Sequence, residues 1–232
     1  MTTIRGARDR ARAEVTAAIK DAARRQVAAE GATKLSLRAV ARELGMVSSA
    51  LYRYFPSRDD LLTALIIDAY DALGEAAESA LATTPAPAAP TERWAAACSA
   101  VRAWALAHPH EYALIYGSPV PGYTAPHDTV GPAARVGMVM ISILRDAQSA
   151  GRLALPPLDA SLAAEGQRLA AELAPDLPPA VVVALVTGWA ELFGLISFEL
   201  FGQFNRLVEQ RDAFYARAVD RIGYEAGLIR RP

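Results

Sequence analysis

Residues 35–62, LSLRAVARELGMVSSALYRYFPSRDDLL, contain two short helical patterns separated by a glycine. In the first pattern, over 36–44, apolar residues recur at i, i+3 and i+7. Gly45 supplies the turn, since glycine adopts positive φ without steric cost. The second pattern covers 48–55, and a longer apolar repeat precedes both at 8–30. Three helices in this order predict a helix-turn-helix.

The second short helix has two distinct faces. Leu51 and Phe55, at i and i+4, form an apolar face that can rest on the two preceding helices. The remaining face is polar and consists of Ser48, Ser49, Tyr52 and Arg53. A slim helix divided in this way fits the major groove of duplex DNA. The pattern therefore indicates a DNA-binding protein.

The rest of the chain is also helical in its pattern. Alternating strands with hairpin turns are absent, and proline and glycine separate the apolar repeats. Further helices are expected at about 58–81, 91–107, 109–116, 132–149, 159–173, 179–204 and 208–226. We expect Thr91 to cap the second of these, after a proline–alanine linker over 83–90, and a loop over 117–131. These features predict an all-α protein.

Charge is distributed unevenly along the chain. The 24 Lys+Arg and 25 Asp+Glu residues give a net charge of −1, but residues 1–60 carry 12 basic against 7 acidic residues. A basic end on an acidic body favours contact with a polyanion, although a solvated charged helix has the same composition. Two interpretations stay open for the first arginines: an arm that follows the minor groove or the phosphates, or a disordered tail. These arginines are Arg5, Arg8, Arg10 and Arg12.

Other functional classes find little support in the sequence. Cys98 is the only cysteine, so neither an internal disulfide nor a zinc-ligand cluster is expected. No nucleophile–base pair, carboxylate pair or phosphate loop occurs at a meaningful spacing, so we expect no enzyme, cofactor or metal. The apolar stretch 180–204 has Glu191 near its middle and is expected to be a core helix rather than a membrane span. Because no secretory signal is evident, a cytoplasmic protein is expected.

The helix-turn-helix spacing of residues 35–62, with Gly45 and the LYRYF block, resembles the DNA-binding signature of TetR-family transcriptional regulators. The resemblance covers about residues 12–65. It implies an all-α homodimer in which residues 1–57 form a helix-turn-helix domain that binds half of a palindromic operator in double-stranded DNA. It also implies that residues 58–232 form a ligand-binding and dimerisation domain.

The resemblance assigns DNA contacts to eight positions. Positions that read or face base edges match Arg38, Ser48, Ser49 and Arg53. Positions that contact phosphate, or in one case a thymine methyl, match Ser36, Tyr52, Tyr54 and Arg58. Tyr54 and Arg58 stand where the family usually has histidine and lysine, and both keep a hydrogen-bond donor for phosphate.

Val47 departs from the family pattern because it occupies the usual Ser/Thr cap of the recognition helix. An apolar cap costs about 1 kcal/mol of helix stability. Two interpretations stay open. Either Val47 is the cap residue, or Ser48 caps the helix one residue later and no longer reads bases.

Towards the C-terminus, residues 108–117 and 188–204 resemble a regulatory domain named for a Trp-His-Gly motif. Trp189 and Gly194 fit this motif, whereas Phe193 replaces the histidine, so we expect an apolar pocket for a small effector. Large aromatic, methionine and isoleucine side chains are candidates to line it, with plain core packing as the alternative for each. They are Trp104, Tyr112, Tyr116, Met138, Ile141, Trp189, Phe193 and Phe198.

The last two helices are the expected dimer interface. Their apolar residues at helical spacing predict a four-helix bundle with the partner. These residues are Val182, Leu185, Val186, Leu192, Phe214, Ala218 and Ile222. Glu191 is expected to bind either a cationic ligand or an arginine of the other subunit. Together the features predict a ligand-responsive repressor, with an activator or a regulator controlled by a protein partner as alternatives.

Overall fold

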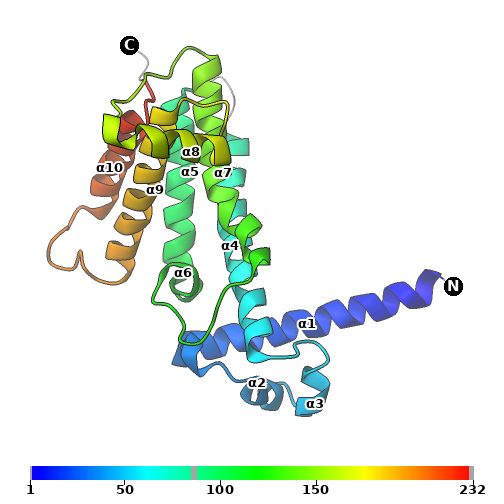
Figure 1. Ribbon diagram of the computed structural model, residues 1–232. Coiled ribbons are helices and arrows are strands. Elements are labelled where there is room, and N and C mark those ends of the chain that lie inside the picture. The colour runs from blue at the N-terminus through cyan, green and yellow to red at the C-terminus, as the bar shows by residue number, and fades with distance from the viewer. Residues whose placement is uncertain (1, 85–87, 230–232) are drawn as a thin grey trace. The chain divides into compact units, whose positions relative to one another are not determined.

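The computed structural model describes residues 2–84 and 88–229, with side chains from residue 7 onward (Figure 1). No strand forms among these residues, and an isolated bridge pairs Leu153 with Leu228, so the all-α prediction is confirmed. The α-helices are α1 (Thr2–Glu30), α2 (Leu37–Glu43), α3 (Ser48–Leu51), α4 (Arg58–Thr83), α5 (Pro90–Ala107), α6 (Pro109–Tyr116), α7 (Val130–Ser149), α8 (Ala163–Leu173), α9 (Pro179–Leu200) and α10 (Arg211–Glu225). Three 3₁₀ turns are η1 (Ala32–Lys34), η2 (His127–Thr129) and η3 (Ala160–Leu162).

The chain forms two compact units, each built from two segments. The first unit comprises Met1–Tyr70 and His110–Pro132, and the second comprises Asp71–Pro109 and Ala133–Pro232. Helix α4 therefore contributes its first half to one unit and its second half to the other.

The first unit packs α1, α2, α3 and the start of α4 around one apolar core. Ile19, Val40 and Leu51 from the first three helices are almost completely buried there, together with Leu61 and Leu62 of α4. The apolar spacing seen in the sequence is the cause, because it places these side chains on the inner face of each helix. Burial of each such side chain contributes about 1.5–3 kcal/mol.

In the second unit, α5, α9 and α10 pack against one another and α8 packs on α9. Buried polar groups of this unit find partners in the backbone: Trp94 Nε1 donates to the Val219 carbonyl at 3.2 Å, and the Tyr215 hydroxyl donates to the Cys98 carbonyl at 2.7 Å. Each satisfied donor avoids a desolvation cost of about 1–3 kcal/mol.

Helix α7 is bonded to α4 within the second unit. The Arg135 guanidinium donates to the Asp71 carboxylate at 2.8 Å and carbonyl at 2.9 Å, and to both Glu78 carboxylate oxygens at 2.7 and 2.9 Å. Gly74 lies beneath this side chain, and a Cβ at this position would stand 2.6 Å from the Arg135 Cβ. The glycine thus permits the close approach of the two helices.

Helix boundaries differ from the sequence prediction at several ends. Helix α1 begins at Thr2 instead of residue 8, and α9 ends at Leu200 instead of residue 204. Gly202 takes a φ of +84°, which ends α9 because an α-helix cannot continue through the left-handed region. Thr91 is not the cap of α5: the cap position is Ala89, with Pro90 as the first helical residue.

Helix α9 is long and apolar enough to cross a membrane by length and composition alone. It packs instead against α5, α8 and α10 in the second unit, as a core helix does. Its central Glu191 forms an ion pair with Arg221 of α10 at 2.6 Å. These contacts agree with the expectation from the sequence.

Candidate nucleic-acid interface

Ser36 begins helix α2 and holds it against α1. Its Oγ accepts a hydrogen bond from the Ala39 backbone N–H at 3.4 Å, and its own N–H donates to Gln26 Oε1 at 3.1 Å. The side chain therefore acts as the N-cap of α2. Two residues further on, Arg38 lies exposed on the outer face of α2, opposite the buried Leu37 and Val40.

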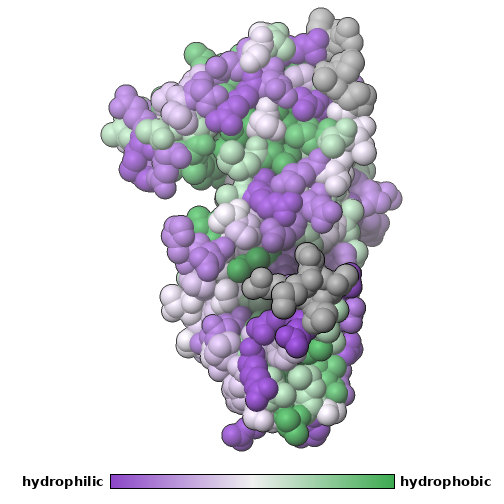
Figure 2. Space-filling view, turned by 90° about the vertical axis from the view of Figure 1, so that its right-hand side faces the viewer, coloured by the Kyte–Doolittle hydropathy of each residue, from purple (hydrophilic) through white to green (hydrophobic). Residues whose placement is uncertain are grey.

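Helix α3 presents a polar face to solvent. Leu51 is 1% exposed and Phe55 is 7% exposed, so they anchor the element in the core. Tyr52 is 43% exposed, and Ser49 and Arg53 are also exposed. In the lower part of Figure 2, where the first unit is seen, hydrophilic and apolar side chains lie next to one another. Ser49, Tyr52 and Arg53 are thus accessible to solvent, whereas Ser48 is only partly exposed.

The α-helical part of this element is shorter than expected. α3 covers Ser48–Leu51, and the residues up to Phe55 continue as turns in which Tyr54 N–H donates to the Leu51 carbonyl at 2.8 Å. Val47 is the N-cap residue, is 70% exposed and makes no side-chain capping bond. Ser48 is the first helical residue, which favours the first of the two interpretations of this cap.

Two predicted phosphate contacts have internal partners. Arg58 donates to the Ala32 carbonyl at 2.9 Å and to the Thr33 carbonyl at 3.4 Å, so it braces η1. Tyr54 is half-buried, and the Arg12 guanidinium lies over its ring at 5.2 Å from the centroid. Arg12 also donates to the Arg53 carbonyl at 3.4 Å. These links join the end of α3 to α1.

The ligand-site candidates of the second unit fall into two groups. The Trp189 and Phe193 rings of α9 are tilted against each other with centroids 4.7 Å apart, and the Trp189 ring would lie 3.3 Å from a Cβ at Gly137 of α7. Ile141 of α7 is buried, and Trp104 is buried against the His108 ring at 5.0 Å. Met138 and Phe198 are instead exposed, and Phe198 contacts Phe204 at 5.7 Å.

Tyr112 and Tyr116 belong to the first unit, where they form a cluster with Tyr70. The Tyr112 and Tyr116 centroids are 5.2 Å apart, and Tyr70 meets Tyr116 edge-on at 6.1 Å. Burial raises the pKa of Tyr116, and the neighbouring Tyr70 and Tyr112 raise it further. The Tyr116 phenol therefore stays neutral at physiological pH.

Both glutamates of α9 pair with arginines of their own chain. Glu191 pairs with Arg221, which also binds Glu225 at 2.7 Å, so the expected partner is an arginine of the same subunit and not of the other one. Glu199 receives two bonds of 2.7 Å from Arg102. Sequence reasoning missed Arg102, Arg135 and the contacts of Arg12 with α3, because the partners are distant in the chain and no spacing signals them.

The residues expected at the dimer interface separate into two sets. Val182, Leu185, Leu192 and Ile222 are buried in the core of their own chain, so that part of the expectation is wrong. Helix α9 packs against α5, α8 and α10 of the same chain, which accounts for this burial. The exposed apolar residues of α9 and α10 are Val186, Phe198, Phe214 and Tyr224, and Phe201 follows α9 directly.

Comparisons with known proteins agree with this geometry. A family model described as "Bacterial regulatory proteins, tetR family" matches residues 19–65, which include α2 and α3. A second model, "Tetracyclin repressor-like, C-terminal domain", matches residues 94–222, more than half of the chain. The chain belongs to the TetR family. It is thus a helix-turn-helix transcriptional regulator, as predicted.

Individual proteins and solved structures are also similar to this chain. HTH-type transcriptional regulator Rv1816 of Mycobacterium tuberculosis is 42% identical over 211 residues, which is 86% of each chain. The crystal structure of regulatory protein SCO4313 superposes with a TM-score of 0.74 at 35% identity, covering 92% of this chain and 97% of the other. A TetR-family regulator from Shewanella sp. PV-4 shares the fold at 17% identity, with a TM-score of 0.60 over 93% and 98% of the two chains.

Proposed function

We propose that this TetR-family protein is a cytoplasmic repressor that binds a palindromic operator as a homodimer and is released by a small apolar effector. The observation that carries the DNA part is the division of α2 and α3 into a buried and an exposed face. Arg38, Ser49, Tyr52 and Arg53 are exposed over an anchored core. Guanidinium groups read guanine edges and hydroxyls bind phosphate, so this surface has the donors that an operator requires.

A two-fold axis would place two such surfaces on one side of the duplex. The exposed apolar side chains of α9 and α10 support this arrangement, because they would be covered by the same face of a second copy. Between them lies a groove of about 510 Å³, lined in part by Leu195, Phe214 and Tyr224. Recognition helices related by the axis would then lie about 34–36 Å apart.

The proposed effector site involves Trp189 and Phe193, whose adjacent rings would offer an apolar wall. Helix α7 contacts this wall at Gly137 and holds α4 through Arg135. An effector that binds one arrangement of α7 better than another would shift the population of α4 positions. Because α4 begins directly after the recognition element, such a shift would change operator affinity.

Selection of bound sequences from random duplex DNA tests the proposal. A palindromic consensus is expected, and Arg38→Ala should lower affinity for it by about tenfold or more and relax the preference at one base pair. Tyr52→Ala should weaken binding, whereas Tyr52→Phe separates loss of the hydroxyl from loss of the ring. Arg25→Ala, an exposed arginine of α1 paired with Glu43, is the matched control. Enrichment of no sequence would overturn the proposed function.

A further inference from the structure

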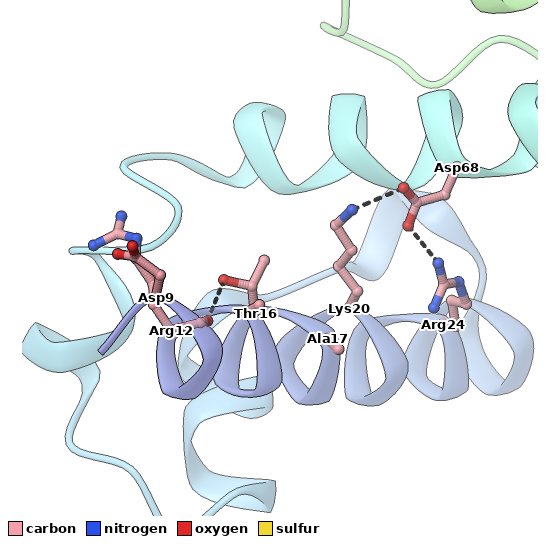
Figure 3. A pocket seen from close by; sticks show the side chains of 8 residues that line it. Asp9, Arg12, Thr16, Ala17, Lys20, Arg24 and Asp68 are labelled. Carbon is pink, nitrogen blue, oxygen red and sulfur yellow. Dashed lines mark hydrogen bonds and ion pairs between the residues drawn. The ribbon is translucent and has the colours of Figure 1, made fainter. Parts of the chain in front are cut away.

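Helix α1 has an anchored part and a projecting part. From Ile19 onward its inner face is buried, and Lys20 and Arg24 bind the Asp68 carboxylate of α4, as Figure 3 shows. Before Val15, every described side chain from residue 7 onward is exposed. The stretch before Val15 is about 20 Å long at 1.5 Å per residue. It buries nothing in its own unit, so core packing does not explain it.

The projecting part carries a row of arginines on one side. In a helix, positions 8 and 12 are four residues apart and share a face, whereas position 10 points to the opposite side. Arg8 and Arg12 stand four residues apart, where like charges repel unless an anion lies between them. Arg8 makes no ion pair or hydrogen bond with another side chain that the structure describes. Of the acidic residues of this part, Asp9 lies beside Arg12, as Figure 3 shows, and Glu14 lies off the row.

The position of Arg12 connects this row to the recognition element. Its guanidinium touches the Arg53 carbonyl and the Tyr54 ring at the end of α3. The face that bears Arg12 therefore leaves the unit beside the exposed Tyr52 and Arg53. Arg8 lies one helical turn further towards the N-terminus of α1.

We infer that the projecting part of α1 binds the sugar–phosphate backbone of the duplex that flanks each half-site. The inference rests on the proposed operator binding and adds a contact outside it. Residues 7–14 contain no apolar side chain larger than alanine, so this helix offers no face for a partner helix. Arginine on a helical row matches phosphate, and a reach of about 20 Å corresponds to about half a turn of duplex.

The test compares Arg8→Ala with Arg10→Ala, two exposed arginines of the same helix on opposite faces. Alanine favours helix, so neither variant should lose structure by circular dichroism. Arg8→Ala should weaken binding to a selected operator with flanks by about three- to tenfold at low salt. The slope of log K against log salt should become shallower by about 1.8, because a dimer loses two contacts at about 0.9 each. Arg10→Ala should match the wild type.

Trimming the operator to its two half-sites gives a second measurement. Removal of the flanks should lower the operator affinity of the wild type and of Arg10→Ala by the same factor. The affinity of Arg8→Ala should remain almost unchanged. Exchange of A·T for G·C pairs in the flanks should not change the affinity, since a contact with the sugar–phosphate backbone does not distinguish base pairs. Equal behaviour of Arg8→Ala and wild type, or a flank effect that depends on base composition, would overturn the inference. If no operator is found at all, the proposed function fails instead.

Discussion

Cys98 shows how burial alone decides the chemistry of one residue. The thiol is 1% exposed in the second unit, and burial raises its pKa, so it remains a neutral thiol at physiological pH. Thiolate is the reactive form, and this site disfavours it. The residue therefore contributes packing and no redox chemistry.

We expect native protein not to react with a thiol reagent such as DTNB at pH 8 over minutes. In guanidinium chloride the same protein should release one equivalent of product, because Cys98 is the only cysteine. The reaction rate at intermediate denaturant then reports opening of the second unit. Rapid reaction of the native protein would contradict the assigned burial.

Individual residues of the recognition surface were largely predictable, but their partners were not. The i, i+4 spacing of Leu51 and Phe55 predicts their burial, and the exposure of Tyr52 follows from it. Arg58 was expected to be a phosphate donor, yet it bonds to the Ala32 carbonyl, 26 residues away in the chain. A backbone carbonyl is present at every residue, so no sequence pattern can identify which one an arginine will choose.

Among the elements, α2 and α3 differ in how their first turns are satisfied. The Ser36 side chain caps α2, whereas Val47 leaves the first N–H groups of α3 without a side-chain acceptor. Unsatisfied N–H groups at a helix start cost stability. We therefore expect α3 to be the less stable of the two helices.

Val47→Ser should therefore raise the free energy of unfolding of the first unit by about 1 kcal/mol, since Val47 already has the extended backbone of a cap residue. Ser36→Ala should lower it by a similar amount. Urea denaturation followed by circular dichroism measures both. Ser118→Ala, an exposed serine in the loop after α6, should change stability by less than about 0.5 kcal/mol. No gain for Val47→Ser would show that α3 is limited by something other than its cap.

The hydrogen bonds between α7 and α4 predict that the stability of the fold depends on pH. The hydrogen bond from Arg135 lowers the pKa of Glu78 below its ordinary value. A carboxylate with a lowered folded-state pKa stabilises the fold above its unfolded pKa of about 4.3, and this contribution is lost as pH falls through the folded value. Because Glu78 is half-exposed, its contribution is below about 1 kcal/mol.

Glu78→Gln should accordingly lower thermal stability at pH 7 and have little effect near pH 3.5. Differential scanning calorimetry at the two pH values measures the change. Glu75→Gln, an exposed glutamate on the same helix, should show neither effect. Equal destabilisation by Glu78→Gln at both pH values would mean that the stabilisation by the hydrogen bond to Arg135 does not depend on the charge of Glu78.

Element order was predictable from apolar spacing, but element ends were not. The pattern over 109–116 predicted α6 to the residue, because Pro109 and Gly117 bound it. The end of α9 depends on the conformation of Gly202, which a flanking apolar sequence, LFGQF, does not reveal. The division into two units was equally hidden, because each combines segments that are distant in the chain.

At the scale of the whole molecule, the exposed apolar face of α9 and α10 leads to a prediction about assembly. Val186→Asp places a charge on this face without entering the core, because Val186 is exposed in the single chain. A buried unpaired carboxylate in an apolar interface costs several kcal/mol, so the dimer should dissociate. Light scattering after size-exclusion chromatography should then show a mass near 24.7 kDa.

Leu173→Asp is the control, because Leu173 is an exposed apolar residue of α8 outside that face. It should leave the mass at twice the chain mass. The monomeric variant should also lose most operator affinity, since one half-site provides only half of the contacts. A dimer that survives Val186→Asp would move the interface to another surface.

The short α3 has a thermodynamic consequence for the encounter with DNA. Four helical residues behind an apolar cap are a weak nucleus, and the turns up to Phe55 already hold helix-like bonds. Contact with phosphates can supply the acceptors that Val47 lacks and extend the helix as the groove closes around it. Calorimetric titration with DNA should then show a larger decrease in heat capacity than rigid docking of the same surface area would produce. In a variant whose α3 is already stabilised, such as Val47→Ser, the decrease in heat capacity should be smaller.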